Sequence, residues 1–323
     1  MRVVFVTRND LGLACLEELV DLGADVRAVF TRPERANISD QTDLSSFAER
    51  HGVGYHETEE LNTEEECARL ASYDPELLFV VGWSRLVDRE VIETASVATL
   101  GMHPAPLPRG RGRAPIAWNL IKGLDETALS FFHLVEEADA GDLVGQHRIP
   151  IFPTDDAASL YAKVVDAGRA LVREHFPRFE SGEVPRTPQN DDEATWWPKR
   201  SPQHGLVDWN QSPGKIHDWI RGQSRPYPGA FSHLPALNHD ADGAGTLVTF
   251  WSTSPPSGER AFGHPGEIAY RDGGRLGVYC FEGALELTEL QVGNDEPIPA
   301  GELVERYDVG LGVRFVNARD QIN

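Results

Sequence analysis

Two kinds of hydrophobic pattern alternate along the first half of the chain. Short continuous apolar runs such as RVVFVT (2–7) and LLFVVGW (77–83) predict buried strands, whereas residues 11–22 place apolar side chains at helical spacing. Strands that alternate with helices imply right-handed crossovers and a mainly parallel sheet covered on both faces. The expected strands are 2–7, 26–31, 53–56, 77–83 and 98–102, and the expected helices are 11–22, 44–51, 64–72, 88–94 and 115–121. The pattern therefore predicts a doubly wound α/β domain, in which ligands lie at the carboxyl ends of the strands.

The pattern after residue 125 extends this domain. Residues 126–136 and 143–151 predict two further strands joined by a turn at 139–141, and residues 157–176 predict a long helix that Pro177 stops. The chain then becomes rich in Pro, Asp, Arg and Gln. We interpret 1–180 as one domain and 181–205 as a linker, packed on that domain by the side chains of Trp196 and Trp197.

The remaining residues, 206–323, carry a different pattern. One helical segment is followed by short β segments separated by turn signals such as Asp272-Gly273-Gly274. The helix is expected at 213–221 and the strands at 230–234, 247–252, 266–271, 276–281 and 285–292. We expect a smaller antiparallel domain that resembles a β-barrel.

Composition narrows the class of protein. Of the 323 residues, 40% are hydrophobic and 25% charged, as in an ordinary soluble globular protein. The three cysteines, Cys15, Cys67 and Cys280, are far apart, which predicts buried thiols rather than disulfides or a zinc site, and we expect no metal. The sequence shows neither a membrane-spanning apolar run nor a signal peptide, so we expect a cytoplasmic protein.

The charge of the chain bears on its partners. The formal net charge is -21, with 4 Lys against 26 Arg. A negative field repels phosphate backbones and therefore disfavours nucleic acid as a partner. The same acidic, Lys-poor composition is typical of proteins from salt-loving organisms, and at molar salt the screening length falls to about 3 Å, where the sign of charge says less.

Several common motifs are absent from the sequence. The first strand is followed by RNDLG (8–12), which lacks the GxGxxG glycines that a dinucleotide fingerprint needs. The chain also has no GxxxxGK[ST], GxSxG or HExxH. Nicotinamide, phosphate-loop, esterase and zinc-protease chemistry therefore have no support.

One histidine and one aspartate are the main catalytic candidates. His103 ends a predicted strand and precedes Pro104, which biases it toward extended geometry. It either shuttles protons or is hydrogen-bonded to a loop carbonyl, and the spacing leaves both open. Asp139 lies in the acidic run EEADAGD (136–142) and is either solvated or orients the His103 imidazole. His133 and His147 lie in predicted strands and are interpreted as packing or surface residues.

Three arginines follow His103 at alternate positions. Arg109, Arg111 and Arg113 are separated by Gly110 and Gly112, so the loop could present forked guanidinium groups to a carboxylate or a phosphate. In so acidic a protein, these arginines could equally pair with its own carboxylates. The spacing does not choose between the two.

These residues are similar to a known family. The run HPAPLPRGRGRAPI (103–116) resembles the HxSLLPxxRGxxP segment of folate-dependent formyltransferases, the group that contains methionyl-tRNA formyltransferase and the amino-sugar N-formyltransferases. ADAGD (138–142) resembles the DxG turn of the same family. Further similarities are GLVDW (205–209), the segments at 220–222 and 225–231, and GALEL (283–287), so the resemblance covers nearly the whole chain.

The resemblance implies a reaction and a set of site residues. It implies that 10-formyltetrahydrofolate donates the formyl group to a primary amine, that His103 stabilises the oxygen of the tetrahedral intermediate and moves the proton, and that Asp139 orients His103. It assigns donor binding to Val81, Gly82, Trp83, Ser84, Arg85, Leu86, Arg111, Gly112 and Arg113, and acceptor binding to Asn9, Asp10 and Arg109.

Two positions depart from the family pattern. Gly101 stands where the family has a third catalytic residue, an asparagine, and Ala105 replaces the usual serine. Loss of one oxyanion donor costs about 100-fold or more in rate. Arg109 and Asn119 are the candidates to replace it.

Three functions compete on this evidence. The first is N-formylation of a nucleotide-linked amino sugar, which the segment RGRAP (111–115) and the acidic C-terminal part favour. From residue 206 onward there are 9 basic and 16 acidic residues, whereas a domain that holds tRNA carries a basic face. The second is methionyl-tRNA formylation, and the third is a folate-binding homologue with lost or hydrolase-like activity. The sequence leaves the oligomeric state open, with a homodimer as one alternative.

Overall fold

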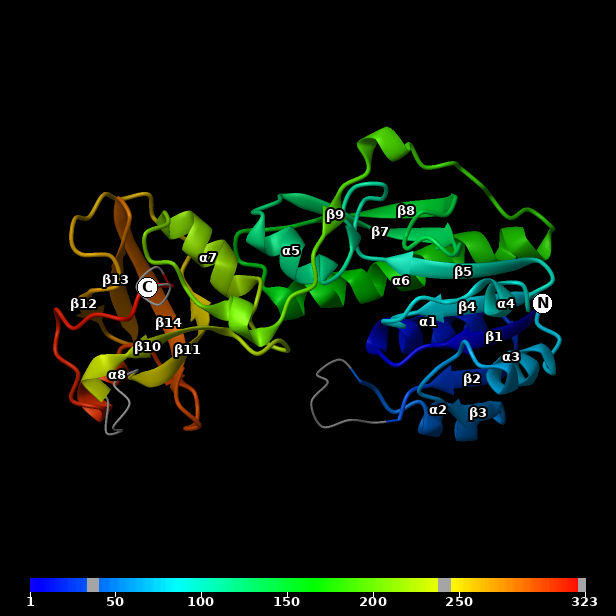
Figure 1. Cartoon of the computed structure of the whole chain (residues 1–323), viewed down its shortest axis with the longest axis horizontal. Coiled ribbons are helices and arrows are strands. Elements are labelled where there is room, and N and C mark those ends of the chain that lie inside the picture. The colour runs from blue at the N-terminus through cyan, green and yellow to red at the C-terminus, as the bar shows by residue number, and fades with distance from the viewer. Residues whose placement is uncertain (34–40, 238–244, 319–323) are drawn as a thin grey trace. The chain divides into compact units, whose positions relative to one another are not determined.

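The computed structural model describes residues 1–33, 41–237 and 245–318. The chain forms two compact units (Figure 1). The first unit consists of Met1–Pro115, Glu126–Pro150 and Tyr161–Lys199, and the second of Ile116–Asp125, Ile151–Leu160 and Arg200–Asn323. The chain therefore passes between the units more than once, and each unit is described here by itself.

A seven-stranded sheet forms the centre of the first unit. Its strand order is β3-β2-β1-β4-β5-β7-β8, in which β1 to β5 run parallel, and β7 and β8 form a hairpin that pairs antiparallel with β5. The predicted doubly wound, mainly parallel α/β fold is confirmed. The strands of this sheet are β1 (Arg2–Val6), β2 (Asp25–Thr31), β3 (Gly54–Glu57), β4 (Leu77–Val81), β5 (Ala98–His103), β7 (Glu126–His133) and β8 (Leu143–Pro150). Two short strands, β6 (Arg111–Gly112) and β9 (Trp196–Trp197), pair with each other outside it. The helices that lie wholly in this unit are α1 (Asp10–Asp21), α2 (Ser45–His51), α3 (Glu64–Ala71), α4 (Arg89–Ile92) and the 3₁₀ helix η1 (Asp191–Glu193). The second unit contains α5 (Pro115–Ile121) from Ile116 onward and the first turn of α6 (Ala157–Glu180), which belongs to the first unit from Tyr161 onward.

Both faces of this sheet are buried, as continuous apolar strands require. On one face the rings of Phe5, Phe79 and Phe131 stack, with neighbouring centroids 5.3 and 5.8 Å apart. The opposite face carries a second apolar cluster that includes Val6 and Val80. Because the two faces take up the alternate side chains of a central strand, β4 is apolar along its whole length and the polar residues that follow it lie beyond its end.

The end of α6 differs from the prediction. The helix does not stop at Pro177 but continues to Glu180 with the proline inside it. Pro177 lacks the N–H that would complete one intrahelical hydrogen bond, a local cost of about 3 kcal/mol. Phe176 and Phe179 are almost completely buried and hold the last turn against the core, which offsets that cost.

The segment after α6 returns to the first unit. Thr187 exchanges two backbone hydrogen bonds with Leu143, at 2.8 and 2.9 Å, and β9 pairs in parallel with β6. The Trp197 ring lies 3.0 Å from where a Cβ on Gly110 would stand. We call residues 187–197 the strap.

The second unit is built on an antiparallel sheet. Its strand order is β10-β11-β14-β13-β12, with β15 paired to β14, and α7 packs against β11 and β14. The rings of Trp209, Phe250 and Phe315 meet in its core at centroid distances of 5.2–5.7 Å. The predicted smaller antiparallel domain is confirmed. Its elements are η2 (Pro202–Gly205), α7 (Pro213–Arg221), β10 (Ala230–Leu234), η3 (Pro235–Leu237), β11 (Thr246–Thr253), β12 (Ile268–Asp272), β13 (Arg275–Cys280), β14 (Gly283–Val292), β15 (Ile298–Pro299) and α8 (Glu302–Arg306).

The cysteines are all free thiols. Burial raises the pKa of Cys15 and of Cys280 to about 12, and Cys67 is half-buried. Within the described residues, no group of three His, Cys, Asp or Glu side chains is arranged to hold a metal ion. Across the same residues, no helix combines the length and the apolar character needed to cross a bilayer.

Candidate active site

Three neighbouring parallel strands bring the predicted site residues to one edge of the sheet. Asn9 follows β1, Gly82 follows β4, and His103 is the last residue of β5. The strands β1 and β4 are adjacent, but the chain continues from β1 to β2 on one side of the pair and from β4 to β5 on the other. The carboxyl ends of β1 and β4 therefore form the topological switch point of the sheet, where open α/β folds bind ligands.

His103 is held between a carbonyl and a carboxylate. Its side chain is 8% exposed, and Nε2 lies 2.8 Å from the carbonyl oxygen of Gly110. Nδ1 lies 3.6 Å from Oδ1 of Asp139, which is an ion-pair distance rather than a hydrogen bond. The hydrogen bond to a loop carbonyl is therefore present, and the imidazole also lies near Asp139.

Asp139 ties the histidine to the loop after β5. Its backbone has a φ of 57°, in the left-handed region that costs a non-glycine residue about 1 kcal/mol. Its Oδ2 accepts a hydrogen bond of 2.8 Å from the backbone N–H of Gly112, so the carboxylate spans from His103 to β6.

The three arginines of the loop have different surroundings. Arg109 is 66% exposed and pairs with Glu193 at 2.8 Å. Arg111 is 2% exposed and pairs with Asp191 at 2.7 Å. Arg113 is exposed, and within the described part of the chain its side chain makes no hydrogen bond or ion pair. Two arginines thus pair with the protein's own carboxylates, and the guanidinium of Arg113 remains available to an anion.

The strap fixes this loop through its backbone. Thr195 accepts hydrogen bonds from the backbone N–H groups of Gly110 and Arg111, both at 2.9 Å, through its hydroxyl and its carbonyl respectively. Gly112 has a φ of 106°, and a Cβ there would lie 2.5 Å from the carbonyl oxygen of Trp197. Only glycine permits this pairing. Sequence reasoning missed the contact, although the β-prone run Thr195 to Trp197 was a signal for a strand.

The loop after β4 is more open. Val81 is buried, Gly82 has a φ of 71° with the Asn9 carboxamide beside it, and Trp83 is half-buried. Ser84, Arg85 and Leu86 are exposed, Leu86 to 60%.

Polar contacts of this edge are few on the β4 side. Arg85 pairs with Glu60 at 2.6 Å. Asn9 caps α1 by accepting a hydrogen bond of 3.2 Å from the N–H of Gly12, and Asp10 is the exposed first residue of that helix. The Asn9 side chain therefore has a structural task in addition to the expected one.

Gly101 lies on the same face of β5 as His103, two positions earlier. A Cβ at Gly101 would lie 2.9 Å from Cδ2 of Leu134, so an apolar side chain fills the space into which a larger residue would project. Of the two candidates to replace the missing amide, Arg109 is engaged by Glu193, and Asn119 is buried in α5 within the second unit.

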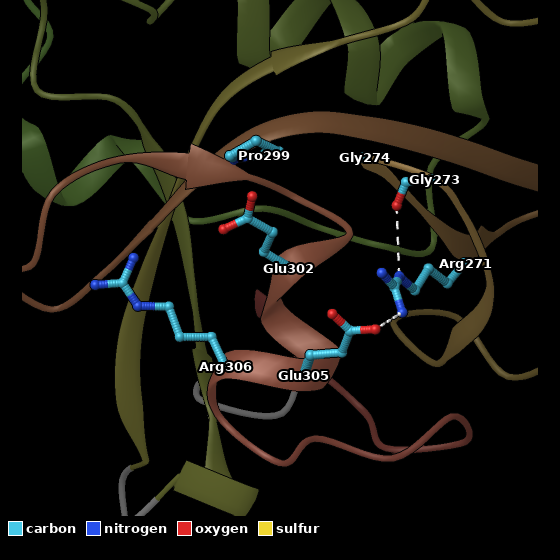
Figure 2. A pocket seen from close by; sticks show the side chains of 7 residues that line it. All are labelled: Arg271, Gly273, Gly274, Pro299, Glu302, Glu305 and Arg306. Atoms are coloured by element: carbon cyan, nitrogen blue, oxygen red, sulfur yellow. Dashed lines mark hydrogen bonds and ion pairs between the residues drawn. The ribbon is translucent and has the colours of Figure 1, made fainter.

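The second unit has a hollow of its own, of about 490 Å³ (Figure 2). Arg271 in its wall pairs with Glu305 at 2.5 Å, and Glu302 and Arg306 project from α8 beside it. Its lining comes from residues 271–306 and includes none of the site residues expected from the sequence.

Comparison with known proteins establishes the family. Residues 1–175 match the family model described as formyl transferase, and residues 199–308 match the formyl transferase C-terminal domain. The first match alone covers more than half of the chain. The chain belongs to the formyl transferase family, as its motifs indicated.

Solved structures of similar fold include three proteins of different description. HypX from Aquifex aeolicus in complex with tetrahydrofolic acid has a TM-score of 0.67 at 23% identity, over 96% of this chain and 48% of HypX. An N-formyltransferase from Helicobacter canadensis in complex with folinic acid and dTDP-3-aminofucose has a TM-score of 0.63 at 16% identity, over 88% and 97%. Methionyl-tRNA formyltransferase from Clostridium thermocellum has a TM-score of 0.54 at 17% identity, over 80% and 94%. At these identities the similarity shows the shared fold, and this chain spans about half the length of HypX.

Proposed function

We propose that the protein transfers a formyl group from 10-formyltetrahydrofolate to the primary amine of a nucleotide-linked amino sugar. The observation that carries the proposal is the His103–Asp139 pair, held at the carboxyl edge of the sheet in a chain of the formyl transferase family. A histidine beside a carboxylate can exchange a proton near neutral pH, and amine formylation requires the amine to lose one.

The residues at this edge suit a folate. Folate combines a flat apolar ring system with a negatively charged tail, and here the exposed Leu86 and half-buried Trp83 offer apolar surface while Arg113 offers an unpaired guanidinium. We assign donor binding to the loop from Val81 to Leu86 together with Arg113. The donor supplies the formyl carbon when bound.

The protein's own groups perform the proton chemistry. His103 would take the proton from the attacking amine, stabilise negative charge on the formyl oxygen, and return the proton to the tetrahydrofolate nitrogen as the bond from that nitrogen to the formyl carbon breaks, while Asp139 keeps the ring oriented. The Gly110 carbonyl only accepts, so Nε2 carries the hydrogen in this contact. That N–H must leave Gly110 to donate to the formyl oxygen, and Nε2 must first give up this hydrogen before it can take one from the amine.

The choice of acceptor rests on two observations. The Helicobacter canadensis neighbour was solved with dTDP-3-aminofucose, and the similarity covers 88% of this chain and 97% of that protein. The C-terminal part of this chain carries 9 basic and 16 acidic residues from position 206, which disfavours tRNA. Asn9, Asp10 and Arg109 are the residues we assign to acceptor binding.

One observation favours a second candidate, which is release of the formyl group to water. Gly101 offers no side-chain amide, and Leu134 fills the adjacent space. A site with one oxyanion donor fewer loses about 100-fold or more in rate, and a slower transfer would leave the formyl group exposed to hydrolysis.

Release of tetrahydrofolate tests both candidates. The protein is mixed with 10-formyltetrahydrofolate and, in separate reactions, a panel of amino-sugar nucleotides, initiator methionyl-tRNA at low and high salt, or no acceptor. Amino-sugar-dependent release that disappears in His103→Ala supports the transferase. Equal release without an acceptor points to the hydrolase, and release that survives His103→Ala overturns the assignment of the site.

A further inference from the structure

Gln189 on the strap makes four hydrogen bonds around the Asp139 turn. Its Nε2 donates to the carbonyl oxygens of Asp139, at 2.8 Å, and Gly141, at 2.7 Å. Its Oε1 accepts from Nε and Nη2 of Arg111, at 3.2 and 2.9 Å. Both donors and both acceptor sites of the carboxamide are therefore used, and no other residue type offers this combination at this length.

The turn that Gln189 contacts is strained on its own. Asp139 has a φ of 57°, which a non-glycine residue adopts only where its surroundings hold it. The opposite side of the turn is closed by β7, since the N–H of His133 donates to the carbonyl of Asp142 at 2.8 Å and a Cβ on Gly141 would lie 1.8 Å from the carbonyl oxygen of His133. Gln189 holds the side that β7 leaves open.

The position of the Asp139 carboxylate depends on this turn. Oδ1 reaches His103 only at 3.6 Å, so a small rotation of the turn would move the carboxylate away from the imidazole. A displacement of 1 Å in a catalytic constellation costs about 100-fold in rate.

We propose that Gln189 is a positioning residue, whose two N–H groups fix the Asp139 turn so that the carboxylate faces His103. The proposal rests on the proposed function for its kinetic consequence, while the geometry of His103 and Asp139 is a property of the protein alone. Arg111, buried and paired with Asp191, in turn orients the Gln189 carboxamide.

Three variants separate this role from general support of the fold. Gln189→Met keeps the length of the side chain but removes all four hydrogen bonds. Gln189→Glu keeps an acceptor for Arg111 and the side-chain volume but removes both donors to the turn, so the protein retains the contact that anchors the strap. Asn190→Ala is the matched control, because that carboxamide caps η1 and contacts Glu193 rather than the turn.

Two readouts are needed. In steady-state kinetics with 10-formyltetrahydrofolate, Gln189→Met and Gln189→Glu should both lower kcat about 10- to 100-fold with KM for the donor within about threefold of wild type, and Asn190→Ala should leave both unchanged. In ¹⁵N spectra of the histidine rings at one fixed pH, the Nδ1 signal of His103, assigned by its loss in His103→Gln, should move in both Gln189 variants toward its position in Asp139→Asn.

The outcomes distinguish the two ideas. If wild type fails to consume the donor, the proposed function fails, whereas the spectra still decide the role of Gln189. If Gln189→Glu keeps the wild-type kcat and the wild-type His103 signal, the donors of Gln189 do not position Asp139 and the inference is overturned. An equal change in Asn190→Ala would also overturn it, because the effect would then belong to the strap as a whole.

Discussion

The loop after β5 and the loop after β4 end neighbouring strands but are held in different ways. In residues 104–113, Gly110 accepts the hydrogen bond from His103, and both Gly110 and Gly112 have positive φ angles. The same loop contains the buried Arg111, and the strap binds its backbone through hydrogen bonds. Residues 82–86 are mostly exposed, with an ion pair from Arg85 to Glu60. The difference places the proposed catalytic groups on firmly held backbone and the proposed donor-binding surface where it can adapt to a ligand.

Replacing the histidine is the largest test of this contrast. His103→Gln should lower kcat about 1000-fold while the donor KM changes by less than about threefold, because the residue acts on the proton rather than on donor binding. Initial rates of tetrahydrofolate release at saturating and limiting donor measure both. His147→Gln, at an exposed position on β8, is the control, and a comparable loss there would show that the assay reports folding instead.

The arginines test how firmly the first loop is held. Arg111→Met should lower the free energy of unfolding of the first unit by about 2–3 kcal/mol, since it removes charge-assisted hydrogen bonds from a side chain that is 2% exposed. Arg109→Met, at 66% exposure, should change it by less than about 0.5 kcal/mol. Urea unfolding followed by fluorescence compares them, and equal effects would mean that the loop is not anchored through Arg111.

The open loop should respond in binding rather than in stability. Leu86→Ala removes exposed apolar surface and should raise the donor KM about three- to fivefold, with the free energy of unfolding unchanged within about 0.5 kcal/mol. Donor titrations and urea midpoints check the two parts. An unchanged KM would remove Leu86 from the proposed donor surface.

Acidification should affect the fixed region through a buried histidine. Burial lowers the pKa of His133, whose Nε2 lies 2.9 Å from the carbonyl oxygen of Pro185, just before the strap. The unfolded chain takes up this proton at about pH 6.5, and the folded protein only at lower pH, so stability is lost as pH falls through about 6.5 toward the folded pKa.

Comparison of urea midpoints at pH 7.5 and 5.5 measures this smallest effect. His56, His175, His217 and His233 have pKa values lowered by burial in the same way, so they add to the total loss. His133→Gln keeps a donor for Pro185 and should reduce the difference between the two midpoints. An unreduced difference would assign the pH dependence to the other four histidines.

The strand and helix pattern was predictable because each element of the first unit buries an apolar face. Short apolar runs such as 2–7 and 77–83 predict buried strands, and both segments form strands in the structure. His103 was recognisable as a residue at the end of a predicted strand. The end of α6 was not predictable, because burial of Phe176 and Phe179 outweighs the local effect of Pro177. The family, too, could be identified from the ordered motifs alone.

The sequence by itself determined the fold class, the family and the two candidate catalytic residues, since these depend on local periodicity and on the order of motifs. Only the tertiary structure decided which arginines form ion pairs with the protein's own carboxylates. It also decided that a segment interpreted as a linker pairs with the loop after β5. The role of Gln189 was equally hidden, because its partners are 48 to 78 positions away along the chain. Such contacts depend on which surfaces the folded backbone brings together, and a single sequence carries no local signal for them.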